Sequence, residues 1–113
     1  LIVISESSKV IGPIQIDIVD TAHALDYAIT SIPAAKIVFQ ADHYSNQFTT
    51  GLSYVGRNGV SLKAQIDRLG LPIDTMLSAH SSATVDYVAF SAKAEEFVPG
   101  LCPTGRKICK DMK

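Results

Sequence analysis

Six neighbouring residues in the middle of the chain, within the stretch QADHYSNQFTTG, carry side chains that could do chemistry. They are Asp42, His43, Tyr44, Ser45, Asn46 and Gln47. An imidazole beside a carboxylate could act as a general base, or it could bind a metal ion together with further ligands. The same side chains could instead line a pore, form a ligand pocket or make a solvated turn.

The other histidines give little support for a metal site. His23 and His80 lie 20 and 37 positions from His43, and neither belongs to a short ligand motif such as HExxH. His80 follows a predicted strand and could approach Asp42 in space. Adjacent residues such as Asp42 and His43, however, rarely bind one ion together. We therefore predict no metal site and no cofactor.

Nucleophilic catalysis needs a serine or cysteine next to a base, and a third group that orients the base. No such set occurs at a recognisable spacing, so we assign no catalytic residues. An enzyme with a site between subunits, built from Asp42, His43, Tyr44 and His80, is a third hypothesis. Whether the protein is an enzyme is left open, and a role other than catalysis is favoured.

The composition is typical of one globular domain, because 47% of the 113 residues are hydrophobic and 19% are charged. The net charge of −1 gives no reason to expect nucleic acid as a partner. The longest apolar run, LIVI, is far too short to span a membrane. No signal-peptide pattern is present, and we predict a cytoplasmic location. The chain starts at Leu1, so it is either processed or a fragment.

We predict a single α+β domain over residues 1–98 and an irregular basic tail over residues 99–113. The basic residues of this tail are Arg106, Lys107, Lys110 and Lys113. Cys102 and Cys109 also lie there, without the CxxC spacing of redox or zinc sites. Free thiols and a disulfide bridge both remain open for this pair.

Hydrophobic periodicity predicts the elements that must position the polar cluster. Residues 14–18 alternate as in a half-buried strand. Residues 22–32 show helical spacing after the capping candidates Asp20 and Thr21, and Pro33 would end that helix. The remaining predictions are strands over 35–41, 48–55 and 73–78, a turn over 56–59, a helix over 60–69, a helix or strand over 82–97, and an extra strand or an arm over 1–8.

The predicted order is therefore β-α-β-β-α-β, which indicates a ferredoxin-like α+β sandwich. Its sheet would be rich in antiparallel pairs and covered by helices on one face. The other face would contact solvent or a partner, and we expect a homo-oligomer formed through that face or through the sheet edges.

Four strings of the sequence resemble the shell domain of bacterial microcompartments, over about residues 10–90. GPIQIDIVDTAHALDYAITSI resembles its first strand and helix, and AAKIVFQADHYSNQFTTGLSYVG resembles its hairpin. GRNGVSLKAQIDRLG resembles its turn and second helix, and IDTMLSAHSSATVDYVAF resembles its last strand and helix. The resemblance implies a shell-domain-like sandwich that assembles into hexameric tiles.

The resemblance also implies roles for particular residues. The loop from Asp42 to Gln47 would line a pore for small metabolites at the symmetry axis. Lys36 and Arg57 would lie at the oligomer edge, where long cationic side chains can contact a neighbouring subunit. Our leading hypothesis is a self-assembling structural subunit. The alternative is a small oligomeric ferredoxin-like protein that binds a ligand or regulates a partner, with the same loop as its pocket.

Overall fold

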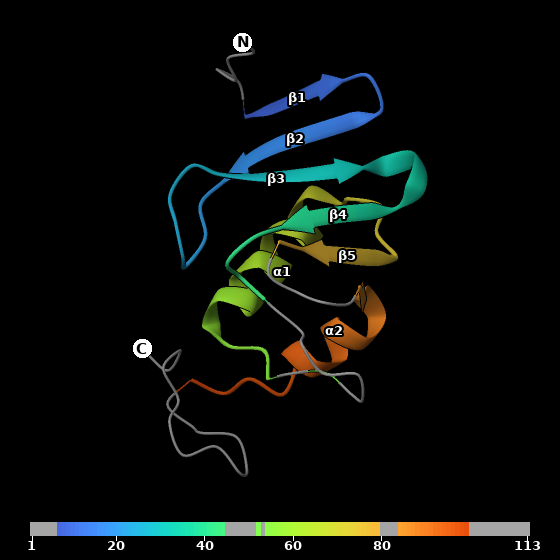
Figure 1. The fold of residues 1–113 in the computed structure, drawn as a ribbon. Coiled ribbons are helices and arrows are strands. Elements are labelled where there is room, and N and C mark those ends of the chain that lie inside the picture. The colour runs from blue at the N-terminus through green and yellow to red at the C-terminus, as the bar shows by residue number, and fades with distance from the viewer. Residues whose placement is uncertain (1–6, 45–51, 53, 80–83, 100–113) are drawn as a thin grey trace.

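The computed structural model describes residues 7–44, 52, 54–79 and 84–99. These residues form an α+β fold with a six-stranded mixed sheet and two helices (Figure 1). The α+β class predicted from the sequence is confirmed. In chain order, the elements are β1 (Ser8–Ile11), β2 (Ile14–Val19), β3 (Tyr27–Ile32), the 3-10 turn η1 (Pro33–Ala35), β4 (Ile37–Gln40), α1 (Arg57–Leu69), β5 (Thr75–Ser78), β6 (Val85–Asp86) and α2 (Tyr87–Ala94).

The strands lie side by side in the order of the sequence, from β1 to β6. Neighbouring strands pair antiparallel, except that β4 and β5 are parallel. A parallel pair needs a crossover connection, and α1 lies within the connection from β4 to β5. The sheet is thus rich in antiparallel pairs, as predicted, but the β-α-β-β-α-β ferredoxin-like order is wrong.

The largest error of the sequence reading concerns residues 22–32, which do not form a helix. Residues 20–26 are a loop and residues 27–32 are strand β3. Within β3, buried Ile29 and Ser31 alternate with the more exposed Ala28 and Thr30, a period of two that also suits β-branched residues. Pro33 starts the turn η1 instead of ending a helix.

The predicted hairpin partner of β4 is also absent from the described residues. Leu52 and residues 54–56 are not strand, and the rest of 48–55 lies outside the description. The pairing of β4 goes to β3 and β5 instead. The predicted turn over 56–59 is wrong, because Gly56 is the N-cap of α1 and residues 57–59 are its first turn.

The predicted strands over 14–18, 35–41 and 73–78 and the helix over 60–69 are confirmed with shifted bounds. Of the predicted strand or arm over 1–8, residues 1–6 lie outside the described residues, and strand β1 begins at Ser8. Helix α1 ends at Leu69, and Gly70 caps it in the left-handed conformation, with φ of 65°. The ambiguous segment 82–97 contains both a short strand, β6, and helix α2. Asp86 caps α2 by accepting a hydrogen bond from the amide of Ala89 at 2.9 Å. The predicted tail residues 100–113, with both cysteines, lie outside the described residues.

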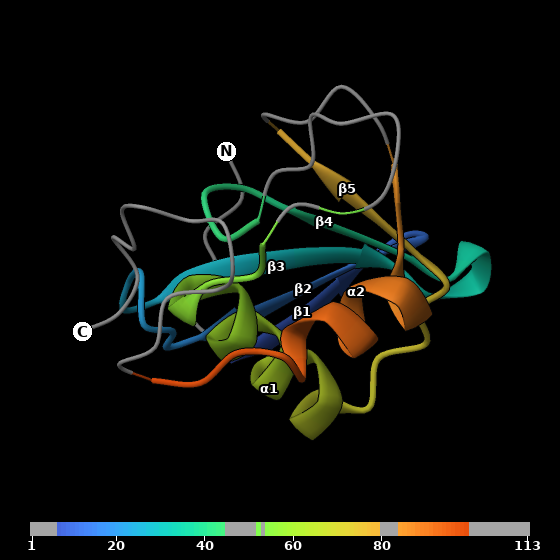
Figure 2. The same ribbon diagram turned by 90° about the horizontal axis from the view of Figure 1, so that it is seen from below.

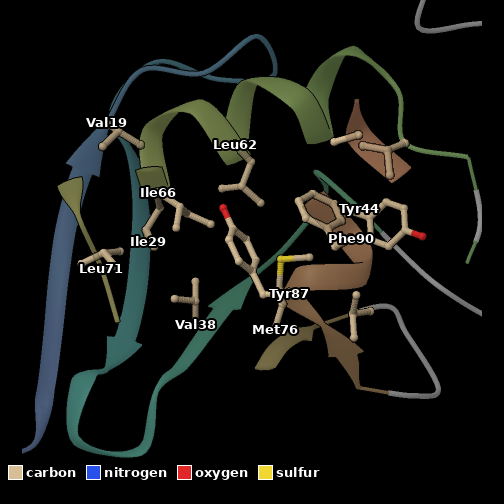
Figure 3. Packing of buried hydrophobic residues seen from close by; sticks show 13 residues of the cluster. Val19, Ile29, Val38, Tyr44, Leu62, Ile66, Leu71, Met76, Tyr87 and Phe90 are labelled. Atoms are coloured by element: carbon tan, nitrogen blue, oxygen red, sulfur yellow. The ribbon is translucent and has the colours of Figure 1, made fainter. Parts of the chain in front are cut away.

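Both helices cover the same face of the sheet (Figure 2), as the sequence predicts. The core forms between the sheet and these helices, where Phe90, Leu62 and Met76 are fully buried (Figure 3). Strand alternation places the residues of β2 that are buried, Asp17 and Val19, on this covered face. Among the described residues, no helix is long and apolar enough to cross a membrane.

Candidate functional site

Three strands end at the same edge of the sheet. Strands β2, β4 and β5 run in one direction, so the segments that follow their carboxyl ends meet there (Figure 1). The segment after β2 is the loop 20–26, and the segment after β4 is the turn 41–44. At the end of β5, the amide of Ala79 donates to the carbonyl oxygen of Gln40 at 3.1 Å.

His23 and Asp42 approach each other at this edge. Nε2 of His23 lies 3.9 Å from Oδ2 of Asp42, and the two side chains are 39% and 53% exposed. Asp42 has a positive φ of 68°, a left-handed conformation that aspartate tolerates better than most residues. The pair therefore places one imidazole nitrogen and one carboxylate oxygen 3.9 Å apart on two partly exposed side chains.

The loop that carries His23 is held by its own side chains and by helix α1. Oγ1 of Thr21 accepts from the amides of His23 and Ala24, each at 3.2 Å. The amide of Ala22 donates to Oγ of Ser61 at 2.8 Å, and Nε2 of Gln65 donates to the carbonyl oxygen of Asp20 at 3.0 Å. Thr21, which the sequence suggested as a helix cap, instead stabilises a turn within the loop.

The turn that carries Asp42 is held by a buried amide. Gln40 is 1% exposed, and its Oε1 accepts from the amides of His43 and Tyr44 at 3.2 and 3.3 Å. Its Nε2 donates to the carbonyl oxygen of Tyr44. The Tyr44 ring packs edge-on against Phe90, with ring centroids 5.0 Å apart (Figure 3). These contacts fasten both ends of the turn to the core.

The hydroxyl of Tyr27 forms two hydrogen bonds with the backbone of Ala41. It donates to the carbonyl oxygen at 3.1 Å and accepts from the amide at 2.7 Å. Burial raises the pKa of Tyr27, and the nearby Asp42 raises it further, while the bond to Ala41 opposes them. The phenol therefore stays protonated at neutral pH and can keep donating.

His43 is 5% exposed, and its ring lies between the loop and the turn. Its Nδ1 is 2.8 Å from the carbonyl oxygen of Ala41, and its Nε2 is 2.7 Å from Oγ1 of Thr21. The ring also packs against Tyr27 and His23, with centroid distances of 4.2 and 5.2 Å. Burial lowers the pKa of His43, which favours the neutral imidazole; the hydrogen bond to Ala41 and the charge of Asp42 oppose this shift, and the neighbouring His23 adds to it.

Helix α1 passes very close to this turn, and Gly59 allows it to do so. A Cβ atom at Gly59 would lie 2.7 Å from Cγ1 of Val55 and 3.4 Å from the carbonyl oxygen of His43. The absence of a side chain at this position thus keeps the helix, the turn and the core in contact.

The residues predicted from the sequence have different positions in the structure. Asp42 is exposed at the candidate site, whereas His43 and Tyr44 are buried and do not face an opening. Ser45, Asn46, Gln47 and His80 lie outside the described residues. Lys36, between η1 and β4, and Arg57, at the start of α1, are exposed. No described contact tests their assignment to an oligomer edge, which stays a prediction.

The sequence reading missed the residues that build the site around Asp42: Thr21, His23, Tyr27 and Gln40. The signal that could have found His23 is the two-residue period of β3. Once residues 27–32 are read as a strand, β2 and β4 become parallel to each other, and the loops that follow them must meet at one edge.

The strands and helices are arranged as in part of the metallo-β-lactamase fold. The metallo-β-lactamase FIM-1 from Pseudomonas aeruginosa, solved in its mono-zinc form, is 21% identical to this chain with a TM-score of 0.55. That match covers 84% of this chain and 44% of FIM-1. The DIM-1 metallo-β-lactamase is 18% identical with a TM-score of 0.52, and the match covers 80% of this chain and 46% of DIM-1.

At these identities the likeness shows the fold alone, and the chain spans less than half the length of either structure. No protein-family model matches the chain, and no curated protein matches it either. The resemblance to microcompartment shell proteins is therefore wrong, because the structural neighbours are metallo-β-lactamases. The hypotheses of a shell tile with a metabolite pore and of a ferredoxin-like regulator are therefore wrong as well.

Proposed function

We propose that this chain contributes to a metal-dependent hydrolase of the metallo-β-lactamase kind, with His23 and Asp42 as two ligands of a zinc ion. The observation that carries the proposal is the approach of the His23 imidazole to the Asp42 carboxylate at the strand ends. The fold supports it, since 84% of this chain matches a part of FIM-1, which has been solved in a mono-zinc form.

The donor atoms are of the types that zinc binds. Zinc binds histidine nitrogen and carboxylate oxygen at about 2.0–2.2 Å in tetrahedral geometry, so two ligand atoms of one ion lie roughly 3.4 Å apart. Nε2 of His23 and Oδ2 of Asp42 are 3.9 Å apart, so the two side chains have to move closer to bind one ion. Both side chains are partly exposed, which leaves room for a water molecule or a substrate beside the ion.

The described residues supply only part of a complete zinc site. No group of three or more His, Cys, Asp or Glu side chains converges among them. His43 lies nearby, but both of its ring nitrogens already have hydrogen-bond partners. Catalytic zinc sites have three protein ligands, and His23 and Asp42 would supply two of them.

A bound zinc ion would supply hydrolysis with a water molecule of lowered pKa and with a Lewis acid that polarises the substrate. This chain would bring one imidazole and one carboxylate to the ion, from the two loops that follow the carboxyl ends of β2 and β4. Asp42 also places a negative charge beside the ion, and its partly exposed position leaves the ion open to substrate.

Metal titration tests the proposal. The metal-free 113-residue chain is titrated with Zn²⁺ and Co²⁺ up to millimolar concentration, and one bound ion per chain is expected. His23→Ala and Asp42→Ala should each weaken binding by more than about tenfold, since each removes a ligand. Glu96→Ala is the matched control, because this exposed carboxylate pairs with Lys93 on α2.

The control should bind metal as the unmodified chain does. Equal affinity in all four proteins would contradict the proposal, since binding would then not involve His23 and Asp42. Failure of the unmodified chain to bind either ion would contradict it as well.

A further inference from the structure

The face of the sheet opposite the helices, the open face, is apolar at its centre. No helix or strand among the described residues covers it, since α1 and α2 both lie on the other side (Figure 2). Phe39 is 43% exposed there. The strand registers bring the large apolar side chains together at the centre: Ile14, Ile16, Ile32, Ile37, Phe39 and Leu77. Large contiguous apolar patches are rare on monomers and mark contact surfaces.

Strand β2 shows that this face is suited to contact with protein. Its open-face positions are Ile14, Ile16 and Ile18, whereas its positions under the helices include Gln15 and Asp17. An antiparallel sheet with one solvated face normally places polar residues on that face and apolar residues on the covered one. In β2 the uncovered side is the more apolar one, which is the pattern of a strand with a further layer of structure against it.

The charged residues of the open face lie on its two outer strands. Lys9 is on β1 and Asp86 is on β6, and both are exposed. Between them, the open-face positions of β2 to β5 carry no charge. An apolar centre with a polar rim is typical of protein interfaces. Opposite charges at opposite edges also make this face complementary to itself.

We propose that the open face binds the open face of a second copy of this chain, so that the two sheets stack about a twofold axis. If the axis runs along the strands, β1 lies over the partner's β6, and Lys9 approaches the partner's Asp86. An axis across the strands would instead bring Lys9 towards the partner's Lys9, which is unfavourable. The charges therefore select the first arrangement.

The size of the open face sets the strength of this dimer. At about 4.8 Å per strand and about 3.3 Å per residue, the six-stranded face measures roughly 24 by 17 Å. Two such faces bury roughly 800–1,000 Å², near the lower limit for a specific interface. We therefore expect a dissociation constant in the micromolar range. The inference goes beyond the proposed function and does not depend on it, because neither His23 nor Asp42 lies on this face.

Sedimentation velocity of the metal-free 113-residue chain, from micromolar to millimolar concentration, tests the proposal. The unmodified chain should shift from monomer to dimer. Phe39→Asp buries an unpaired charge at the centre and should weaken association by more than about tenfold. Thr30→Lys, beside Phe39 in the register, replaces a side chain that is already polar and should act similarly. Val88→Asp is the matched control, because this valine is 76% exposed on α2, and it should dimerise as the unmodified chain does.

The orientation of the two copies is tested at the charged edges. Lys9→Glu would face the partner's Asp86 with a like charge and should weaken association by about two- to fivefold. Adding Asp86→Asn removes this repulsion and should restore most of the affinity, while asparagine can still cap α2. If Lys9→Glu associates as the unmodified chain does, the proposed arrangement is wrong.

Isoleucine methyl signals in NMR spectra locate the contact. Those of Ile16 and Ile32 on the open face should move with protein concentration, and those of buried Ile29 and Ile66 should not. Melting temperatures establish that each variant is folded. A chain that stays monomeric at millimolar concentration would overturn the proposal, and the open face would then belong to a contact with a different molecule. A dimer that neither Phe39→Asp nor Thr30→Lys weakens would also contradict it, since another surface would be responsible.

Discussion

Both faces of the sheet carry many apolar residues, but among the described residues the buried polar side chains all lie on the helix-covered side. The face opposite the helices presents Lys9, Ile11, Ile14, Ile16, Ile18, Ala28, Thr30, Ile32, Ile37, Phe39, Thr75, Leu77 and Asp86, as the strand registers require. Phe39 is 43% exposed there. The helix-covered side contains the fully buried core together with Asp17, Ser31, Gln40 and His43.

The residues of the two faces are therefore constrained in different ways. Aliphatic side chains on the open face contribute in proportion to their burial and can replace one another. Polar groups on the covered side must each find a partner, because an unsatisfied buried group is costly. Gln40 and His43 meet that requirement by binding the turn that presents Asp42. The covered side therefore determines the geometry of the candidate site.

Two phenylalanines provide the largest test of the comparison. Phe90 is fully buried against Tyr44 and Tyr87 on the covered side, whereas Phe39 lies on the open face. Phe90→Ala should lower the free energy of unfolding by about 3–5 kcal/mol, and Phe39→Ala by roughly 1 kcal/mol. Urea unfolding monitored by circular dichroism measures both. Equal losses would mean that the open face is as fully packed as the core.

A second test concerns polar groups on the two faces. Gln40→Leu leaves the amides of His43 and Tyr44 without their acceptor, so we expect a loss of at least about 2 kcal/mol in the free energy of unfolding. Thr30→Val on the open face is the matched change and should stay within about 0.5 kcal/mol. Gln40→Leu should also weaken metal binding. A stable Gln40→Leu variant would show that the turn does not need this amide.

The sequence predicts those parts of the fold in which one signal dominates. Residues 14–18 alternate cleanly, and Leu62, Ile66 and Leu69 form an apolar stripe that ends at Gly70. Both elements were predicted correctly. Residues 22–32 satisfied a helical spacing and a strand alternation at once, and tertiary pairing with β2 and β4 selected the strand.

The candidate site was only half predictable for the same reason. The polar cluster after β4 was visible in the sequence, and Asp42 within it does lie at the site. Its partner His23 lies next to it only because β3 pairs with both β2 and β4. The predicted helix over residues 22–32 leaves no place for that strand. The burial of Asp17 is also not evident from the sequence, although this carboxylate is 2% exposed and accepts a hydrogen bond from Gln15 at 2.9 Å.

The smallest test uses alkaline pH, because the titratable side chains of the two faces differ. Burial raises the pKa of Tyr87 on the covered side, and its hydrogen bond to Asp67, at 2.9 Å, raises it further. Among the described strand residues, the open face carries no tyrosine, and its titratable groups are Lys9 and Asp86. Alkaline sensitivity that arises from tyrosine should therefore belong to the covered side.

The sign follows from linkage. Below about pH 10, Tyr87 is protonated in both the folded and the unfolded chain, and its contribution to stability is complete. Above that pH the unfolded chain ionises while the folded one resists, so the free energy of unfolding falls as pH rises. Tyr87→Phe should cost about 0.5–1.5 kcal/mol near pH 7, and less at higher pH. Urea unfolding of both proteins from pH 7 to above pH 10 measures the difference in their free energies of unfolding. The contribution of lysine titration cancels in this difference. A difference that does not change with pH would mean that Tyr87 ionises as freely in the folded chain as in the unfolded one.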